Sequence, residues 1–200
     1  MAVGARDRIL EAACEAIAAE GIDDVRIARV AQRAGASTAL VHHYFSTREE
    51  LLEQALMRSY EVAAADRFGR PVDPDASATE RLRVMIDECL PLPGMQRDEW
   101  TLWVELWLQA TRDPAMQPMG TRLYEAYRNW MLEVIELGVE RGEFTTDEPE
   151  ASADFAIGLL DGLGVRALIG DPEMDIERVR SLAARKIAIE LGLDPSELSD

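Results

Sequence analysis

The chain has 200 residues, of which 38 are acidic and 21 basic, so its formal net charge is −17. An indiscriminate nucleic-acid binder is basic overall, so this charge argues against that class but leaves room for a local basic patch. The hydrophobic fraction of 48% excludes a disordered chain, and the length predicts one or two domains.

The predicted elements are helices throughout, because apolar residues recur at steps of three and four and no segment alternates like a strand. A first helix is expected over residues 5–20 and ends at Gly21. Two short helices follow over about residues 27–34 and 38–44, the second capped by Ser37. A long fourth helix begins after Thr47 and fades near residue 69.

Five more helices are expected in the rest of the chain, over about residues 78–90, 98–112, 115–141, 150–169 and 176–191. Breaks rich in proline, glycine and aspartate separate them, beginning with a loop at residues 70–77. We therefore predict an all-α protein of nine helices. Its expected domains are a small N-terminal one at residues 1–48 and a larger helical one at residues 49–200.

Charge is unevenly distributed between these two parts. Residues 1–60 carry a net charge of −2, and residues 61–200 carry −15. The stretch from Val25 to Arg48 contains no acid, and it holds both histidines as well as Arg26, Arg29 and Arg33. This acid-free window is a candidate anion-binding surface on an otherwise acidic protein.

The window contains two short helices joined by a tight turn. Gly35 stands where the chain must turn sharply, a position that favours a left-handed backbone. Apolar residues that include Val41 and either Tyr44 or Phe45 are expected to pack inward. The outward face is then small and polar, as a helix in the major groove requires, although two helices buried in an ordinary helical protein would have the same spacing. Its members are Thr38, Ala39, His42 and His43.

A metal site at the two histidines is not expected. A protein zinc site needs three or four ligands, and adjacent side chains on a helix point about 100° apart. We therefore predict neither a bound metal nor a cofactor.

Residues 8–52 resemble the N-terminal domain of TetR-family transcriptional regulators. The resemblance rests on RILEAA at 8–13, Gly21, Val30-Ala31-x-x-Ala34-Gly35-x-Ser37, YFS at 44–46 and REELL at 48–52. It implies that Thr38, Ala39, His42 and His43 approach bases and that Ser37, Tyr44 and Arg48 contact phosphates. Arg26, in the same acid-free window, completes the expected DNA-binding set.

The chain departs from the family pattern at several positions. His42 stands where the family usually has tyrosine, Ala36 replaces the common valine, and Arg48 replaces a lysine. Arg26 takes the place of a capping threonine, so the second helix is expected either to be capped by Asp23 or Asp24 or to begin differently.

Three tryptophans lie on one stripe of the sixth predicted helix. Such a stripe is either solid core or the wall of a cavity, since each indole offers a flat face and an N–H group. The TetR resemblance implies a small-molecule pocket among these middle helices, and a ligand that shifts the fourth helix. The expected ligand-binding residues are Met85, Met95, Trp100, Trp103, Trp107 and Tyr127.

The helix expected at residues 150–169 is apolar on two faces. One face can cover the core of its own subunit, whereas the other requires either a partner or a large monomeric core. The last helix has the same character, so two helices from each subunit would form a four-helix bundle across a two-fold axis. The last two helices also resemble the dimerisation region of the BetI-like branch of the family, through LDGL at 160–163. The expected interface residues are Phe155, Leu159, Gly162, Arg166, Leu182 and Ile189.

Together these features predict a homodimeric transcriptional repressor that binds a palindromic operator in double-stranded DNA and is released by a small-molecule effector. The alternatives are a helical regulator that acts through protein contacts without DNA, and an all-helical enzyme. The enzyme is disfavoured because the sequence has no HExxH motif, phosphate loop or Ser/His/Asp set. Cys14 and Cys89 are expected to be reduced thiols in a cytoplasmic protein, and no apolar run is long enough for a membrane helix.

Overall fold

The computed structural model describes residues 4–68, 73, 75–114 and 116–198. Within them the chain forms nine α-helices and two short 3₁₀ helices, with no strand. This confirms the prediction of an all-α protein. The chain divides into two compact units, Met1–Asp66 with Asp98–Arg122 and Arg67–Arg97 with Leu123–Asp200. The predicted domain boundary between residues 48 and 49 concerns independent folding and stays a prediction.

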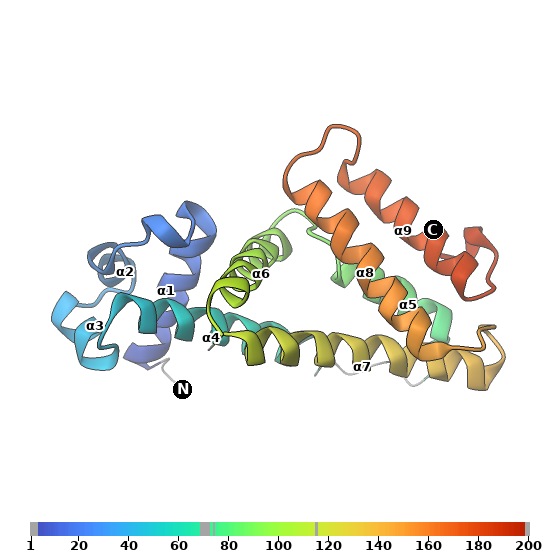
Figure 1. The fold of residues 1–200 in the computed structure, drawn as a ribbon, viewed down its shortest axis with the longest axis horizontal. Helices are drawn as coiled ribbons and strands as arrows, with labels where there is room; N and C mark the ends of the chain where they lie inside the picture. The colour runs from blue at the N-terminus through green and yellow to red at the C-terminus, as the bar shows by residue number, and fades with distance from the viewer. Residues whose placement is uncertain (1–3, 69–72, 74, 115, 199–200) are drawn as a thin grey trace. The chain divides into compact units, whose positions relative to one another are not determined.

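The first unit begins with three helices that pack on one another, shown in blue in Figure 1. Its helices are α1 (Ala5–Glu20), the 3₁₀ helix η1 (Ile22–Asp24), α2 (Ile27–Arg33), α3 (Thr38–Tyr44), α4 (Arg48–Phe68) and α6 (Met95–Arg112). The inward residues predicted for α1 are all buried, namely Ile9, Ala13, Ala16 and Ile17. We call α1 to α3 the head.

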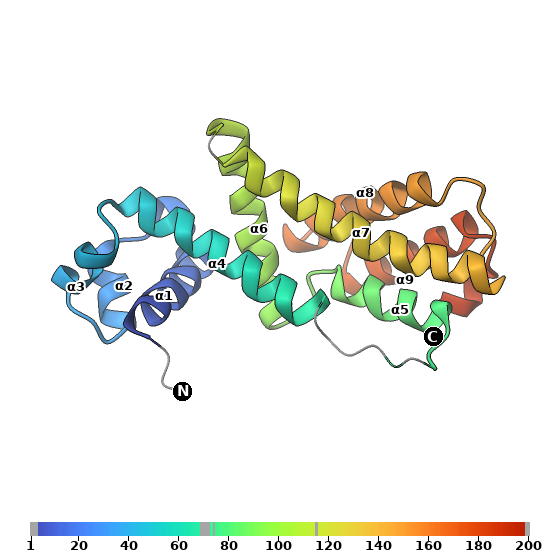
Figure 2. The ribbon, with the colours of Figure 1, turned by 90° about the horizontal axis from the view of Figure 1, so that it is seen from below.

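The second unit has a hydrophobic core formed by four helices. They are α5 (Ala78–Glu88), α7 (Gln117–Arg141, whose first residues belong to the first unit), α8 (Pro149–Leu168) and α9 (Ile176–Glu190), followed by the 3₁₀ helix η2 (Pro195–Leu198). Helices α8 and α9 lie side by side and contact each other (Figures 1 and 2). A two-pronged ion pair joins α9 to α5, with Arg180 Nε and Nη2 at 2.5 and 2.6 Å from the Asp87 carboxylate.

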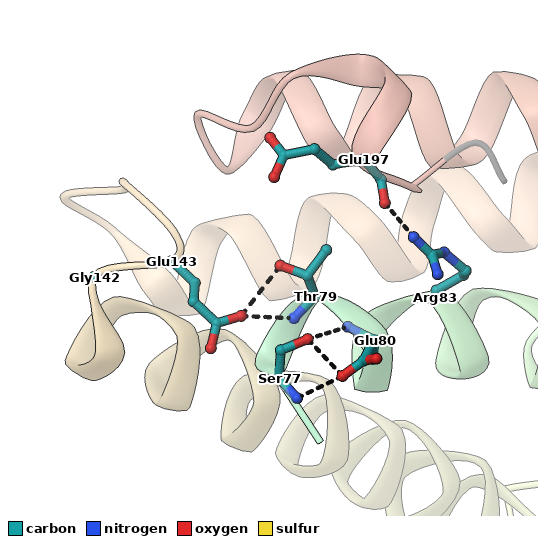
Figure 3. A pocket seen from close by; sticks show the side chains of 7 residues that line it. All are labelled: Ser77, Thr79, Glu80, Arg83, Gly142, Glu143 and Glu197. Carbon is teal, nitrogen blue, oxygen red and sulfur yellow. Dashed lines mark hydrogen bonds between the residues drawn. The ribbon is translucent and has the colours of Figure 1, made fainter. Parts of the chain in front are cut away.

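The N-terminus of α5 lies in a pocket in which several lining residues are hydrogen-bonded to one another (Figure 3). Ser77 and Glu80 form a capping box, and the Glu143 carboxylate accepts hydrogen bonds from the backbone N–H groups of Ala78 and Thr79 at 3.1 and 3.0 Å. Burial opposes ionisation of Glu143, but these hydrogen bonds outweigh it and lower its pKa. Glu143 therefore ties the connection after α7 to α5.

The predicted helices agree with the observed ones except at a few ends. Helix α6 begins at Met95 instead of residue 98, and α7 begins at Gln117 instead of residue 115, which itself lies outside the described residues. Of the predicted loop at residues 70–77, positions 70–72 and 74 also lie outside them. None of the described helices is long and apolar enough to cross a membrane.

Candidate functional site

Helices α2 and α3 are joined by a turn of four residues, 34–37. Gly35 has a φ of 61°, and the N–H groups of Gly35 and Ala36 donate to the carbonyls of Gln32 and Ala31 at 3.2 and 2.9 Å. These two bonds are those of a Schellman motif, which ends α2. The Ser37 hydroxyl then accepts a hydrogen bond from the Leu40 N–H at 3.1 Å and starts α3, as predicted.

Helix α3 packs one face on α1 and α2 and presents the other to solvent. Val41 is fully buried and so is Phe45, which decides between the two aromatic residues that were expected to pack inward. The opposite face consists of exposed side chains, those of Ser37, Thr38, Ala39, His42, His43 and Tyr44. A short helix held by a tight turn with a small polar face outward is the arrangement of a helix-turn-helix reader of the major groove.

Helix α2 begins without a side-chain cap. Arg26 is its N-cap residue and is exposed, and its side chain makes no capping hydrogen bond. The prediction that Asp23 or Asp24 caps α2 is therefore wrong, because both residues lie in η1, one turn earlier. The other alternative, a helix that begins differently, is met, because α2 starts at Ile27 with no capping side chain.

Two arginines of the acid-free window pair with an acid outside it. The Glu20 carboxylate accepts a hydrogen bond from Arg33 Nη2 at 2.9 Å and another from Arg29 Nη1. Sequence analysis missed this residue, although Glu20 closes α1 one turn before the window. The window therefore carries less uncompensated positive charge than its four arginines suggest.

Arg48 is held by backbone carbonyl groups. Its Nε donates to the Val25 carbonyl at 2.8 Å, and its Nη2 donates to the carbonyls of Asp23, at 3.0 Å, and Ile22. The prediction that Arg48 contacts phosphate stays untested. Its guanidinium is already hydrogen-bonded to these three backbone carbonyls.

The three tryptophans of α6 lie together in the first unit. The ring centroids of Trp100 and Trp103 are 6.0 Å apart at an interplanar angle of 46°, and those of Trp100 and Trp107 are 6.0 Å apart at 89°. Trp100 is only 1% exposed, and no acceptor among the described residues bonds its indole N–H. Tilted and edge-to-face pairs are the preferred packing of aromatic rings, so this geometry fits a solid core as well as the wall of a cavity.

Two titratable groups have pKa values that burial raises. Burial raises the pKa of Asp161 on α8 to about 6, while a hydrogen bond from the Tyr124 hydroxyl at 2.8 Å acts in the opposite direction. Burial also raises the pKa of the Cys14 thiol to about 12, and Cys14 Sγ donates to the Ala55 carbonyl. Cys14 and Cys89 are both free thiols, and the raised pKa makes Cys14 a poor nucleophile.

Comparison with known proteins begins with two family profiles. Residues 9–55 match that of "Bacterial regulatory proteins, tetR family", and residues 78–192 match that of "BetI-type transcriptional repressor, C-terminal". The chain belongs to the TetR family. It is a transcriptional repressor of the BetI type, and the alternative of an enzyme is set aside because this family consists of transcriptional regulators.

Individual relatives agree with this assignment over nearly the whole chain. The HTH-type transcriptional regulator BetI of Escherichia coli K12 is 28% identical over 191 residues, which is 94% of this chain and 95% of the relative. A putative transcriptional regulator from Saccharomonospora viridis, solved in complex with choline, is 30% identical with a TM-score of 0.82, over 93% of this chain and 95% of that one. A TetR regulator from Haloarcula marismortui is 26% identical with a TM-score of 0.76, over 94% and 96%.

TetR-family regulators bind operator DNA as dimers and respond to small-molecule effectors. The residues predicted for the dimer interface lie on α8 and α9. The first apolar stripe of α8 is buried in the core of its unit, as predicted. The second stripe is more accessible, with Phe155 at 44% exposed and Gly162 also exposed, and Ile189 of α9 is 53% exposed. These residues define the α8/α9 face.

The remaining predicted interface residues differ in accessibility. Leu159 and Leu182 are partly buried against the core. Arg166 is half-exposed and bonded to the Asp171 carboxylate at 2.6 to 2.7 Å, so it fixes the turn between α8 and α9.

The six predicted ligand-binding residues fall in different units. Trp100, Trp103 and Trp107 belong to the first unit, whereas Met85 and Tyr127 belong to the second. Met85 is buried in the core of that unit, and Tyr127 packs against the core with its ring edge-on to Trp130. The side chain of Met95 lies outside the described part of the structure.

We expect His42→Ala to weaken binding to DNA from upstream of the protein's own gene about tenfold. The imidazole is exposed on α3, and one base contact contributes about 1–3 kcal/mol of discrimination. Gel shifts measure the affinity, and circular dichroism should show unchanged helical content. Thr111→Ala, an exposed position on α6, is the control, and equal affinity of the His42 variant and wild type would contradict the assignment of α3.

Proposed function

We propose that the protein is a repressor that binds a palindromic operator through α3 of two subunits and is released by a small quaternary ammonium compound. The single observation that supports the effector class best is the tryptophan cluster of α6, considered beside the 30% identical relative that was solved with choline. Because chromosomal DNA is the target, we place the protein in the cytoplasm.

The chemistry of the cluster suits such a cation. A quaternary ammonium group cannot donate N–H bonds, so proteins recognise it through the faces of aromatic rings, above all tryptophan. The unbonded Trp100 N–H would provide a donor for an oxygen of the same ligand. The protein has one conformation that fits the operator and another that does not. The effector releases the operator if it binds the second conformation more tightly than the first.

The operator and interface assignments have their own support. The six exposed residues of α3 and its cap form the expected reading face, and the exposed N-cap Arg26 lies at the start of the adjoining helix. Across a two-fold axis, the α8/α9 face would meet its own copy and bury the exposed Phe155 and Ile189. A two-fold dimer reads two half-sites, so the operator should be palindromic.

The test of the effector is release of operator DNA, followed by fluorescence anisotropy during titration with choline. We expect release by choline but not by its uncharged analogue, in which a tert-butyl group replaces the trimethylammonium group. Trp107→Leu keeps an apolar side chain but removes a ring, and should raise the half-effective choline concentration about tenfold, the equivalent of ~1–2 kcal/mol for one desolvated cation–π contact.

Trp130→Leu in the second unit is the matched control and should leave the choline response unchanged. A repressor that stays on its operator at millimolar choline would overturn the effector class. Equal release by choline and its uncharged analogue would likewise show that the rings do not act on the charge.

A further inference from the structure

Arg48, the first residue of α4, uses most of its hydrogen-bonding capacity inside the head. A guanidinium has five N–H donors in a fixed fork, and three of those in Arg48 reach the carbonyls of Ile22, Asp23 and Val25. These carbonyls belong to the connection between α1 and α2. Nη1 lies 3.8 Å from the Glu49 carboxylate. The charge is therefore engaged by oxygens of the protein before any DNA arrives.

A second set of contacts holds the start of α4 to the other side of the head. The Glu50 carboxylate accepts hydrogen bonds from the Ser46 N–H at 2.8 Å and from Gln54 Nε2 at 3.1 Å. Gln54 in turn accepts from Arg6 Nη2 of α1 at 2.5 Å, and the Arg6 guanidinium lies 5.7 Å from the centre of the Phe45 ring. The first two turns of α4 are thus bonded to α1 as well as to the α1–α2 connection.

We propose that Arg48 is a positioning residue that makes α4 and the helix-turn-helix move as one body, and that it is not a phosphate ligand. The inference rests on the proposed function, because it concerns how a displacement of α4 reaches α3. Without the bonds from Arg48, α4 would be held to the head by the Arg6–Gln54–Glu50 contacts and by packing. A shift of α4 would then change the orientation of α3 less.

The shape of the side chain is essential to this role. The planar fork of Arg48 donates to three carbonyls through Nε and Nη2, whereas the ammonium of lysine is a point charge on a flexible stem. A single-point phosphate contact, by contrast, can be made by either cation, because lysine also binds phosphate as a point charge. Arginine and lysine at this position therefore distinguish the two roles.

The experiment compares Arg48→Met, Arg48→Lys and Arg26→Met in operator binding over a range of salt concentrations, with and without saturating choline. Loss of one phosphate contact lowers the slope of log affinity against log salt by about one. We expect both Arg48 variants to bind the operator about tenfold more weakly with an unchanged slope. We also expect choline to change their affinity at least threefold less than it changes that of wild type.

Arg26→Met, which removes an exposed arginine beside the same surface, should lower the slope and keep the full choline response. A slope reduced by about one in Arg48→Met together with wild-type behaviour of Arg48→Lys would overturn the inference. If Arg48→Met does not fold, Arg48→Lys alone decides, because it retains the charge and the stem. Failure of the wild-type protein to bind the operator or to respond to choline would instead contradict the proposed function.

Discussion

Gly138→Ala is expected to destabilise the protein by about 3 kcal/mol or more, the upper range for overpacking in a closed core. A Cβ at this position of α7 would lie 2.1, 2.4 and 2.5 Å from three carbons of the Phe144 ring. The ring cannot withdraw, because Phe144 is buried and its N–H and that of Glu143 both donate to the Gly138 carbonyl. Thermal unfolding should show a fall in Tm on the order of 10 °C.

Gly120→Ala in the same helix is the matched control for this variant. Its Cβ would meet only the Ala110 side chain, at an ordinary 3.6 Å, so the higher helix propensity of alanine should leave stability unchanged or raise it by up to ~1 kcal/mol. Adding Gly138→Ala to Phe144→Ala should cost little, since the ring is then gone. A Gly138 variant as stable as wild type would contradict the close packing of Phe144.

Phe155→Asp is expected to convert the dimer to a monomer and to lower operator affinity more than a hundredfold. The change places a charge in the middle of the α8/α9 face, where two subunits would have to bury it. A monomer holds one half-site, and loss of the linked second contact forfeits an avidity of about 10²–10⁴. Sedimentation or light scattering measures the first effect, and fluorescence anisotropy measures the second.

Val84→Asp provides the control for the added charge. Val84 is 59% exposed on α5, outside the α8/α9 face, so its variant should remain dimeric and bind the operator normally. A Phe155 variant that stays dimeric at nanomolar concentration would show that another surface joins the subunits. A monomeric variant with undiminished operator affinity would show that the dimer is not needed for binding.

Features that depend on neighbours in the sequence could be predicted closely. The turn at Gly35 and the cap at Ser37 follow from local backbone chemistry, so the limits of α2 and α3 were predicted to within one residue. The two apolar faces of α8 follow from helical periodicity alone, and one of them is buried in the core as predicted. The absence of a cap on α2 was not foreseen, because acids that precede a helix can also form a turn of 3₁₀ helix.

Features that require distant segments to meet could not be predicted. The spacing of residues does not reveal that the carbonyls around Asp23 converge on Arg48, and the TetR resemblance implies only a phosphate contact for this side chain. Likewise, a helical stripe shows that the three tryptophans share a face, but it does not show that Met85 and Tyr127 belong to another compact unit. The clash that forbids a side chain at Gly138 depends on the chain doubling back after α7.

The pairing of Glu20 with Arg29 and Arg33 has a consequence for how the regulator finds its target in a chromosome. A genome offers about 10⁶–10⁹ competing sites, so occupancy depends on the ratio of specific to general affinity and not on tight binding as such. By neutralising two arginines, Glu20 lowers the affinity for DNA of any sequence. Discrimination between sequences is then left to the small side chains of α3. Selection on this one carboxylate could therefore widen or narrow the set of promoters under control without altering the residues that read bases.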